Sequence, residues 1–423
     1  MSRFLKRTGT TDLNVFYPIR SECEADVPTT RFKPRSGKTL SARRWHASFS
    51  QEGHLDIAKV LRLIQRGGVH PSIKGVVWEF LLGCYDPNST FEERNQIKEQ
   101  RRQQYSVWKS ECRTMVPVIG TGKFLTSPLI DDDELPIDES LIGVPISDKK
   151  TLRWMQTIHQ IGLDVVRTDQ ALVFYENESN QAELWDVLAV YAWIDNDIGY
   201  VQGYFFCRMN EICSPLVILL DNEADSFWCF ERAMRRMREN FRTSASSMGV
   251  QSHLSTLSQI MKTVDPQLHQ HLEDLDAGEY LFAFRMLMVL FRREFSFVDT
   301  LYLWELMWAM EYDPKLFSLY EESEVTRTDD TTPAINDKLW KKYGKFQRKN
   351  LQTGNTEQQF SALSVFLVAS VLEIKNRRIL KEAKGVEDVV KILGDITSHL
   401  DAKKACDEAL KIQKKYLSKA KKP

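Results

Sequence analysis

The chain has 423 residues, with 57 Lys and Arg against 58 Asp and Glu, and a formal net charge of −1 at pH 7. Hydrophobic residues make up 43% of the chain, so a sizeable core can be buried and global disorder is excluded. The near-neutral charge argues against a nucleic-acid partner, which would require a basic excess.

Compartment signals are consistent with a soluble cytoplasmic protein. Seven cysteines with no CxxC pair are typical of a reducing compartment. Residues 1–7 lack the apolar core of a secretory signal, and no apolar stretch approaches the roughly 20 residues that span a bilayer. We therefore expect a cytoplasmic location.

The predicted elements are all helices. Residues 1–54 are polar and basic in places, and we interpret them as an irregular N-terminal extension that precedes a large domain. Helical spacing of apolar residues, or a continuous charged pattern bounded by Gly and Pro, then predicts helices over 55–67, 71–82, 91–110, 184–194, 226–242, 254–264, 279–293, 300–310, 360–382, 386–393 and 402–417. Polar insertions at about 113–150 and 321–358 interrupt this pattern. Strand alternation persists nowhere, so the predicted fold class is all-α.

The sequence lacks the usual machinery of an enzyme with its own active site. Gly120–Lys123 looks like part of a phosphate-binding loop, but Pro117 replaces its first glycine and Phe124 replaces the Mg²⁺-binding Ser or Thr. His269 and His271 are two residues apart and cannot share one helix face as metal ligands. We therefore expect no hydrolase site, metal or cofactor of the protein's own.

Two short motifs carry the functional signal. Ile161, Asp164 and Arg167 form I-x-x-D-x-x-R, and Tyr200 and Gln202 form Y-x-Q after it. With these motifs the sequence resembles the TBC domain of Rab GTPase-activating proteins. Other stretches resemble the opening, middle and late signatures of that family: Arg66–Val69, Gly75–Gly83, Met209–Pro215, Phe291–Phe295 and Leu303–Glu305. The resemblance covers about residues 55–420, apart from the two insertions, and implies a multi-helix TBC-domain fold.

By this resemblance, Arg167 is the catalytic arginine finger and Gln202 the glutamine finger. Asp164 would orient Arg167 from one helical turn away, Tyr200 would fix the glutamine loop, and Gly203 would allow close approach. In GTP hydrolysis a guanidinium neutralises the charge that develops on the phosphate oxygens, and an arginine supplied in trans accelerates the reaction by about 10³–10⁵. A side-chain amide can hold the attacking water in line.

The resemblance also implies the partner, a Rab-type small GTPase in its GTP-bound state. GTP and Mg²⁺ would belong to that partner, which would bring this protein into peripheral contact with endomembranes and into vesicle traffic. Taken singly, an Arg near a helix end is usually a solvated or ion-paired residue, and a Gln before a Gly is usually a loop residue. The joint occurrence of both motifs favours the finger interpretation.

One feature departs from the family pattern. The family's glutamine motif runs directly into the next helix, whereas here Tyr204–Arg208 separates Gly203 from Met209. Five extra helical residues would turn the following face by about 500°, leaving it ~140° out of phase, and a loop would place three aromatic side chains beside the site. A displacement of Gln202 by about 1 Å would cost ~10² in rate.

This insertion keeps other interpretations open. The chain could be a catalytically impaired TBC protein that acts as a Rab-binding effector or scaffold, or an unrelated helical adaptor if the motifs are coincidental. The codons of Tyr204–Arg208 can also be written as a pyrimidine-rich tract that runs into AG, like the end of an intron. We hypothesise on this basis that the five residues mark a splice or gene-model variant.

Overall fold

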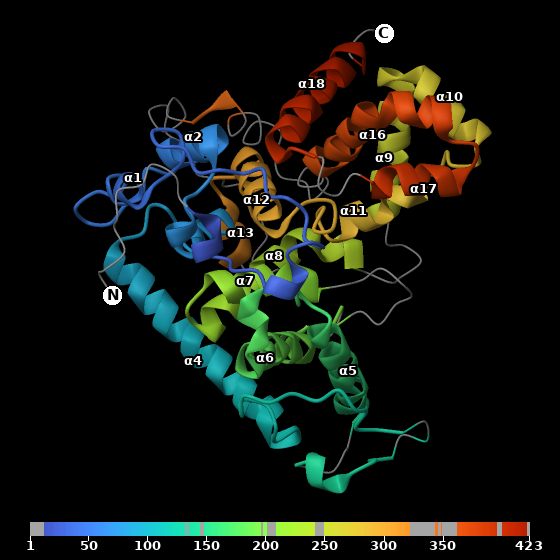
Figure 1. The fold of residues 1–423 in the computed structure, drawn as a ribbon. Helices are drawn as coiled ribbons and strands as arrows, with labels where there is room; N and C mark the ends of the chain where they lie inside the picture. Colours follow the sequence, from blue (N-terminus) through green and yellow to red (C-terminus); the bar gives the residue numbers. More distant parts are fainter. Residues whose placement is uncertain are drawn as a thin grey trace, which may run out of the picture.

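The computed structural model describes residues 12–131, 133, 135–143, 148–195, 198–200, 209–241, 249–321, 343–345, 348, 362–395 and 400–420. Within these ranges the regular elements are helices, and β pairing is limited to isolated bridges such as Ile19 with Leu172 (Figure 1). The predicted all-α class is confirmed. None of the helices described is long and apolar enough to cross a membrane.

The α-helices in chain order are α1 (Ala42–His46), α2 (Ile57–Gly67), α3 (Lys74–Leu81), α4 (Phe91–Met115), α5 (Lys149–Val166), α6 (Glu178–Ile194), α7 (Asn210–Leu219), α8 (Glu223–Phe241), α9 (Gly249–Val264), α10 (Pro266–Asp274), α11 (Phe284–Met288), α12 (Phe297–Glu311), α13 (Leu316–Glu321), α16 (Ala362–Glu382), α17 (Val386–Gly394) and α18 (Ala402–Ala420). Short 3-10 turns are η1 (Leu13–Val15), η2 (Ser21–Cys23), η3 (Pro71–Ile73), η4 (Glu139–Leu141), η5 (Val173–Glu176) and η6 (Leu281–Ala283).

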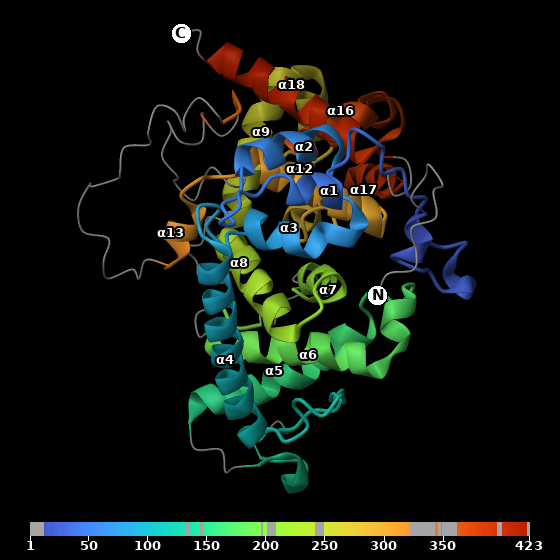
Figure 2. The ribbon, with the colours of Figure 1, turned by 90° about the vertical axis from the view of Figure 1, so that its left-hand side faces the viewer.

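Two groups of helices are linked by the contact of α8 with α9. In one group α4, α5, α7 and α8 pack around α6, and in the other α9 and α18 pack against α16 (Figures 1 and 2). Helix α12 packs against α2, α3 and α18, and α8 also contacts α9. The long helix α4 runs along the edge of the first group, as Figure 2 shows. This arrangement buries α12 almost completely.

Side-chain caps explain where several helices begin. Thr90 and Glu93 form a reciprocal capping box at the start of α4, with Glu93 accepting from the Thr90 amide at 2.7 Å. Asp148 accepts from the Thr151 amide at 2.9 Å and so begins α5. Such caps satisfy backbone N–H groups that have no partner within the helix. The start of α5 matters most here because this helix carries Arg167 at its other end.

A buried ion pair lies inside the aromatic core between α3 and α12. The Lys74 ammonium donates to the Glu305 carboxylate, and both side chains are fully buried. Glu305 also accepts from Trp78 Nε1 at 3.1 Å and from the Val69 amide at 2.9 Å. The indole rings of Trp78 and Trp308 pack edge to face at 4.8 Å. Charges so deeply buried are tolerated because each one is paired and hydrogen-bonded.

The described part of the N-terminal extension, residues 12–54, packs on the rest of the protein instead of merely preceding a separate domain. Leu40 and Trp45 are buried in the core, and Leu40 exchanges backbone hydrogen bonds of 2.9 Å with Gly68 and His70 on either side of the turn after α2. Residues 12–54 contain η1, η2 and α1 but are otherwise irregular. Their few apolar side chains are spaced without a helical period, and they are fixed by packing on the rest of the protein.

Two other expectations differ from the structure. A single helix over 279–293 is wrong, because Tyr280, Leu290 and Phe291 adopt left-handed φ values of 57°, 46° and 60° that break it into η6 and α11. In the 113–150 insertion, the two ends belong to α4 and α5, and some apolar residues between them are buried: Val116, Ile119, Leu129 and Ile130. Of the 321–358 insertion, only 321, 343–345 and 348 lie within the described residues.

Candidate functional site

Arg167 caps the C-terminus of α5. Its amide donates to the carbonyl of Asp164 at 3.1 Å, and the Thr168 amide donates to Val165 at 3.0 Å, which tightens the last turn. Asp169 then takes a left-handed φ of 45°, and the chain leaves the helix direction. The Arg167 side chain is 55% exposed and therefore accessible to another macromolecule.

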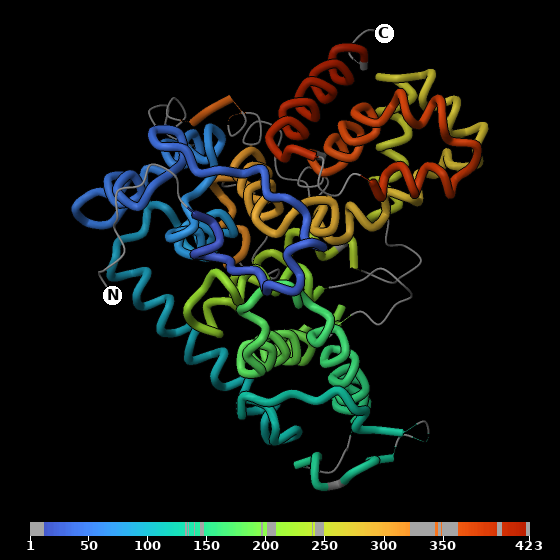
Figure 3. Tube along the Cα trace, in the orientation of Figure 1, coloured from blue at the N-terminus to red at the C-terminus, as the bar shows by residue number. Residues whose placement is uncertain are grey.

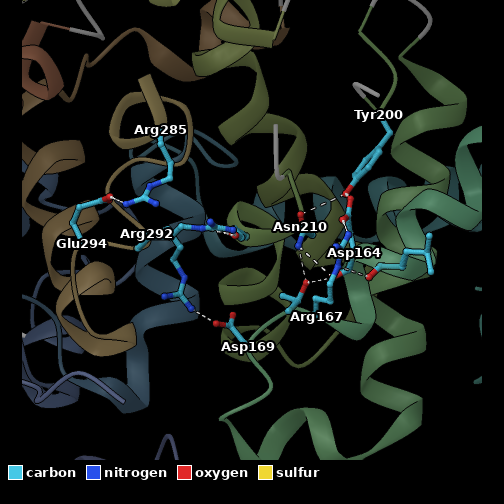
Figure 4. A network of polar contacts seen from close by, with 12 residues as sticks. Asp164, Arg167, Asp169, Tyr200, Asn210, Arg285, Arg292 and Glu294 are labelled. Atoms are coloured by element: carbon cyan, nitrogen blue, oxygen red, sulfur yellow. Dashed lines mark hydrogen bonds and ion pairs between the residues drawn. The ribbon is translucent and has the colours of Figure 1, made fainter. Parts of the chain in front are cut away.

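A buried carboxylate holds this exposed guanidinium. Asp164 Oδ1 accepts from Arg167 Nη2 at 2.6 Å, and Asp164 Oδ2 accepts from the Tyr200 hydroxyl at 2.7 Å (Figure 4). Arg167 Nε also donates to the Leu163 carbonyl at 3.0 Å. Asp164 and Tyr200 are both buried, so these bonds are shielded from competing water. The structure thus brings together three of the five site residues that the sequence predicted.

The remaining two predicted site residues, Gln202 and Gly203, lie outside the described residues, as does the insertion Tyr204–Arg208. The described chain leaves the site at Tyr200 and returns to it at Met209, directly before α7. The roles of the arginine and the glutamine as fingers therefore stay predictions.

Two residues of the site, Thr168 and Asn210, were not predicted from the sequence. The Asn210 side-chain amide donates to Thr168 Oγ1 at 2.7 Å, and Thr168 Oγ1 donates to the Asp164 carbonyl at 2.7 Å. The Tyr200 hydroxyl also lies 3.4 Å from Asn210 Oδ1. Asn210, the first residue of α7, thereby ties the end of α5 to the segment that carries the glutamine motif. Asn210 lies within the stretch Met209–Pro215, whose resemblance to a family signature was the sequence signal that could have indicated it.

Asp169 forms a second anchor beyond Arg167. Its Oδ1 pairs with the guanidinium of Arg292, and its Oδ2 accepts from Ser214 Oγ of α7 at 2.5 Å. The N-terminal segment also reaches this loop, because the Arg20 amide donates to the Ala171 carbonyl at 2.8 Å and the Val173 amide donates to the Pro18 carbonyl at 3.0 Å. Figure 3 shows the two segments running side by side.

The described residues contain no group of three or more His, Cys, Asp or Glu side chains that could hold a metal ion. The described groups around Arg167 are a carboxylate, hydroxyls and an amide, an arrangement that can orient an arginine. An exposed, internally anchored arginine at the end of a helix is suited to stabilising negative charge on a partner.

The fold agrees with the comparisons to known proteins. Residues 143–320 match the family model described as the Rab-GTPase-TBC domain. The Ypt/Rab-GAP domain of Gyp1p shares the fold, with a TM-score of 0.59 at 17% identity over 88% of this chain and 98% of that one. Residues 143–320 are thus similar to the Rab-GTPase-TBC domain family, and the fold is that of the Rab-GAP domain of Gyp1p.

Several curated relatives carry names from this family. Rab GTPase-activating protein 22 of Arabidopsis thaliana is 28% identical, covering 64% of this chain and 66% of its own length. TBC1 domain family member 17 of Homo sapiens is 30% identical, covering 67% of this chain and 39% of its own length. GTPase-activating protein gyp7 of Schizosaccharomyces pombe is 28% identical, covering 67% and 36%. The chain thus spans less than two thirds of each of these relatives.

Proposed function

We propose that this protein accelerates GTP hydrolysis on a Rab-type small GTPase in its GTP-bound state, with Arg167 supplied in trans. The observation that carries the proposal is the exposed Arg167 guanidinium held by the buried Asp164 carboxylate at 2.6 Å. A planar cation placed on the transferring phosphate offsets the charge that develops there. Because folding already fixes one end of the guanidinium, less conformational entropy is lost when the partner docks.

In the same proposal, Gln202 orients the attacking water. Its motif begins at Tyr200, whose hydroxyl donates to the carboxylate that also holds Arg167. This shared acceptor supports a coupled placement of the two fingers. GTP and Mg²⁺ come with the partner, so the protein needs no cofactor of its own. Contact with endomembranes is made through the partner, and the outcome is the termination of a GTP-bound signal in vesicle traffic.

A second function is favoured by one sequence observation, the five residues Tyr204–Arg208 between the glutamine motif and α7. If they displace Gln202, the protein binds a Rab without accelerating hydrolysis and serves as an effector or scaffold. Both functions share the docking surface around Arg167 and differ in the rate of the chemical step.

Single-turnover GTP hydrolysis on a panel of purified Rab proteins tests the proposal. For a Rab that the wild type accelerates, Arg167→Ala should lower the stimulated rate by about 10³–10⁵, and Gln202→Ala should also lower it. Arg153→Ala is the matched control, since Arg153 is another exposed arginine of α5, and it should leave the rate unchanged. Binding without acceleration would favour the scaffold function, and neither binding nor acceleration on any Rab would refute both.

A further inference from the structure

Arg292 connects the part of the protein around α11 and α12 to the loop that follows Arg167. Its guanidinium pairs with Asp169, which is two residues beyond the finger position, although the two residues lie 123 positions apart in sequence (Figure 4). Both side chains are largely buried, with exposed fractions of 10% and 15%. The pair is therefore an internal contact rather than a solvated surface ion pair.

The backbone just before Arg292 adopts an unusual conformation, and the Arg292 side chain that follows it extends to Asp169. Leu290 and Phe291 both adopt left-handed conformations, which non-glycine residues rarely take unless the surroundings hold them. The Phe291 amide donates to the Met286 carbonyl at 2.8 Å, and the Phe291 ring is fully buried. The Arg292 guanidinium then lies over the Phe297 ring, 5.0 Å from its centroid. Packing on an aromatic face restricts the arginine before it meets Asp169.

In the loop that follows Arg167, Thr168 and Asp169 are each held by side-chain contacts. Thr168 is bound by Asn210, and Asp169 is bound by both Arg292 and Ser214. Asp169 has a left-handed φ of 45°, and its carbonyl accepts from the Leu172 amide at 2.9 Å. A left-handed aspartate persists where its surroundings over-determine it, and the paired carboxylate supplies that constraint.

We propose that Arg292 is a positioning residue for Arg167: by pairing with Asp169 it fixes the backbone on the C-terminal side of the finger and so sets where the guanidinium emerges from α5. The proposal rests on the function proposed above, because it assigns the effect on rate to Arg167. A displacement of a catalytic group by about 1 Å is enough to lower a rate by ~10².

The chain offers a matched control in the same region. Arg285 of α11 pairs with Glu294 at 3.1 Å, and the Glu294 side chain is 2% exposed (Figure 4). Arg285→Met therefore leaves a buried carboxylate without this partner, as Arg292→Met does, but the carboxylate that it affects belongs to the segment 285–294. A general loss of stability should appear in both variants, whereas a positioning effect should appear in Arg292→Met alone.

The first measurement is amide hydrogen exchange of the full chain without a partner. The amides of Thr168 and Leu172 should exchange at least about tenfold faster in Arg292→Met than in wild type, and remain unchanged in Arg285→Met. Arg292→Lys, which keeps the charge, should restore part of the protection, and Asp169→Asn should reproduce the effect if Arg292→Met fails to fold. Equal exchange at these amides in all the variants would overturn the proposal.

The second measurement is single-turnover hydrolysis on the Rab that the wild type accelerates most. Arg292→Met should lower the maximal stimulated rate at least about tenfold at unchanged half-saturation, and Arg285→Met should stay within about twofold of wild type. An equal loss in both variants would show a merely structural role. If the wild type stimulates no Rab, the proposed function fails, and the exchange experiment alone decides whether Arg292 fixes the loop.

Discussion

Arg167 and Asp164 lie one helical turn apart, and their 2.6 Å contact joins an exposed cation to a buried carboxylate. The guanidinium end of the pair is exposed to solvent, and the carboxylate end is buried. A hydrogen bond of this kind is stronger than a surface ion pair because water does not compete for the carboxylate. The structure therefore restrains the arginine before any partner arrives.

The Asp164 carboxylate should matter for rate more than for binding. We expect Asp164→Asn to lower the stimulated rate of GTP hydrolysis at least about tenfold with little change in Rab affinity, because the guanidinium loses its charged anchor. Tyr200→Phe should have a smaller effect. Because both residues act through one carboxylate, the double variant should lose less than the sum of the two single losses. Strict additivity in single-turnover assays would contradict a shared anchor.

Deletion of Tyr204–Arg208 should raise GTPase stimulation. On the hypothesis that the insertion displaces Gln202, the deletion restores the family spacing between Gly203 and Met209 and brings the side chain back to the site. The measurement is the stimulated rate on the same Rab panel, with replacement of the five residues by alanines as the control for length. An unchanged rate after deletion would show that the insertion is tolerated. Transcript sequencing across the junction tests the splice hypothesis separately.

The buried pair Lys74 and Glu305 should be costly to break on one side. Lys74→Met leaves the Glu305 carboxylate buried without its countercharge, and we expect a loss of about 3–5 kcal/mol in the free energy of unfolding, measured with urea. Adding Glu305→Gln should recover part of this loss, because the buried charge is removed and the single amide oxygen can still accept from one of the two donors, Trp78 Nε1 or the Val69 amide, which bind different carboxylate oxygens. A double variant less stable than Lys74→Met would contradict this assignment.

Gly162 should tolerate no side chain. A Cβ at this position of α5 would lie 1.7 Å from the Leu125 carbonyl oxygen, so Gly162→Ala must displace either the helix or the segment that crosses it. We expect destabilisation of about 1–3 kcal/mol or more in thermal or urea unfolding. Gly394→Ala in α17 is the control, because its Cβ would meet no atom within 4 Å, and it should be neutral or stabilising.

A buried carboxyl makes stability depend on pH. Burial raises the pKa of Glu79 from its ordinary 4.5 to about 7, an effect that Lys98 and Arg102 oppose and Asp225 reinforces, with Tyr85 donating to Glu79 at 3.4 Å. The folded state therefore binds this proton more tightly than the unfolded state. The stabilising contribution of this protonation is fully present below pH 4.5 and is lost as pH rises through about 7.

Glu79→Gln removes this titration. Relative to wild type, the variant should gain about 1–3 kcal/mol in free energy of unfolding between pH 4.5 and pH 8, as measured by urea unfolding at several pH values. A difference between the two proteins that does not change with pH would show that Glu79 stays charged or neutral throughout.

The sequence predicted what depends on local spacing. Long amphipathic patterns predicted α2, α9 and α18, and the three-residue spacing from Asp164 to Arg167 predicted their contact. The break in 279–293 was not predictable, because apolar residues at helical spacing there adopt left-handed conformations imposed by packing. The pairing of Asp169 with Arg292 spans 123 positions and depends on how the helices pack.

The antiparallel bridge between Ile19 and Leu172 bears on how the protein should be cut for laboratory work. The family model spans 143–320, yet Leu40 and Trp45 are buried in the shared core, and α18 packs on α12 from the other end of the chain. A fragment limited to residues 143–320 would expose apolar surface. It would also lose the N-terminal residues that hydrogen-bond to the loop after Arg167. A fragment for expression should therefore include all the segments that pack together and should begin no later than Asp12.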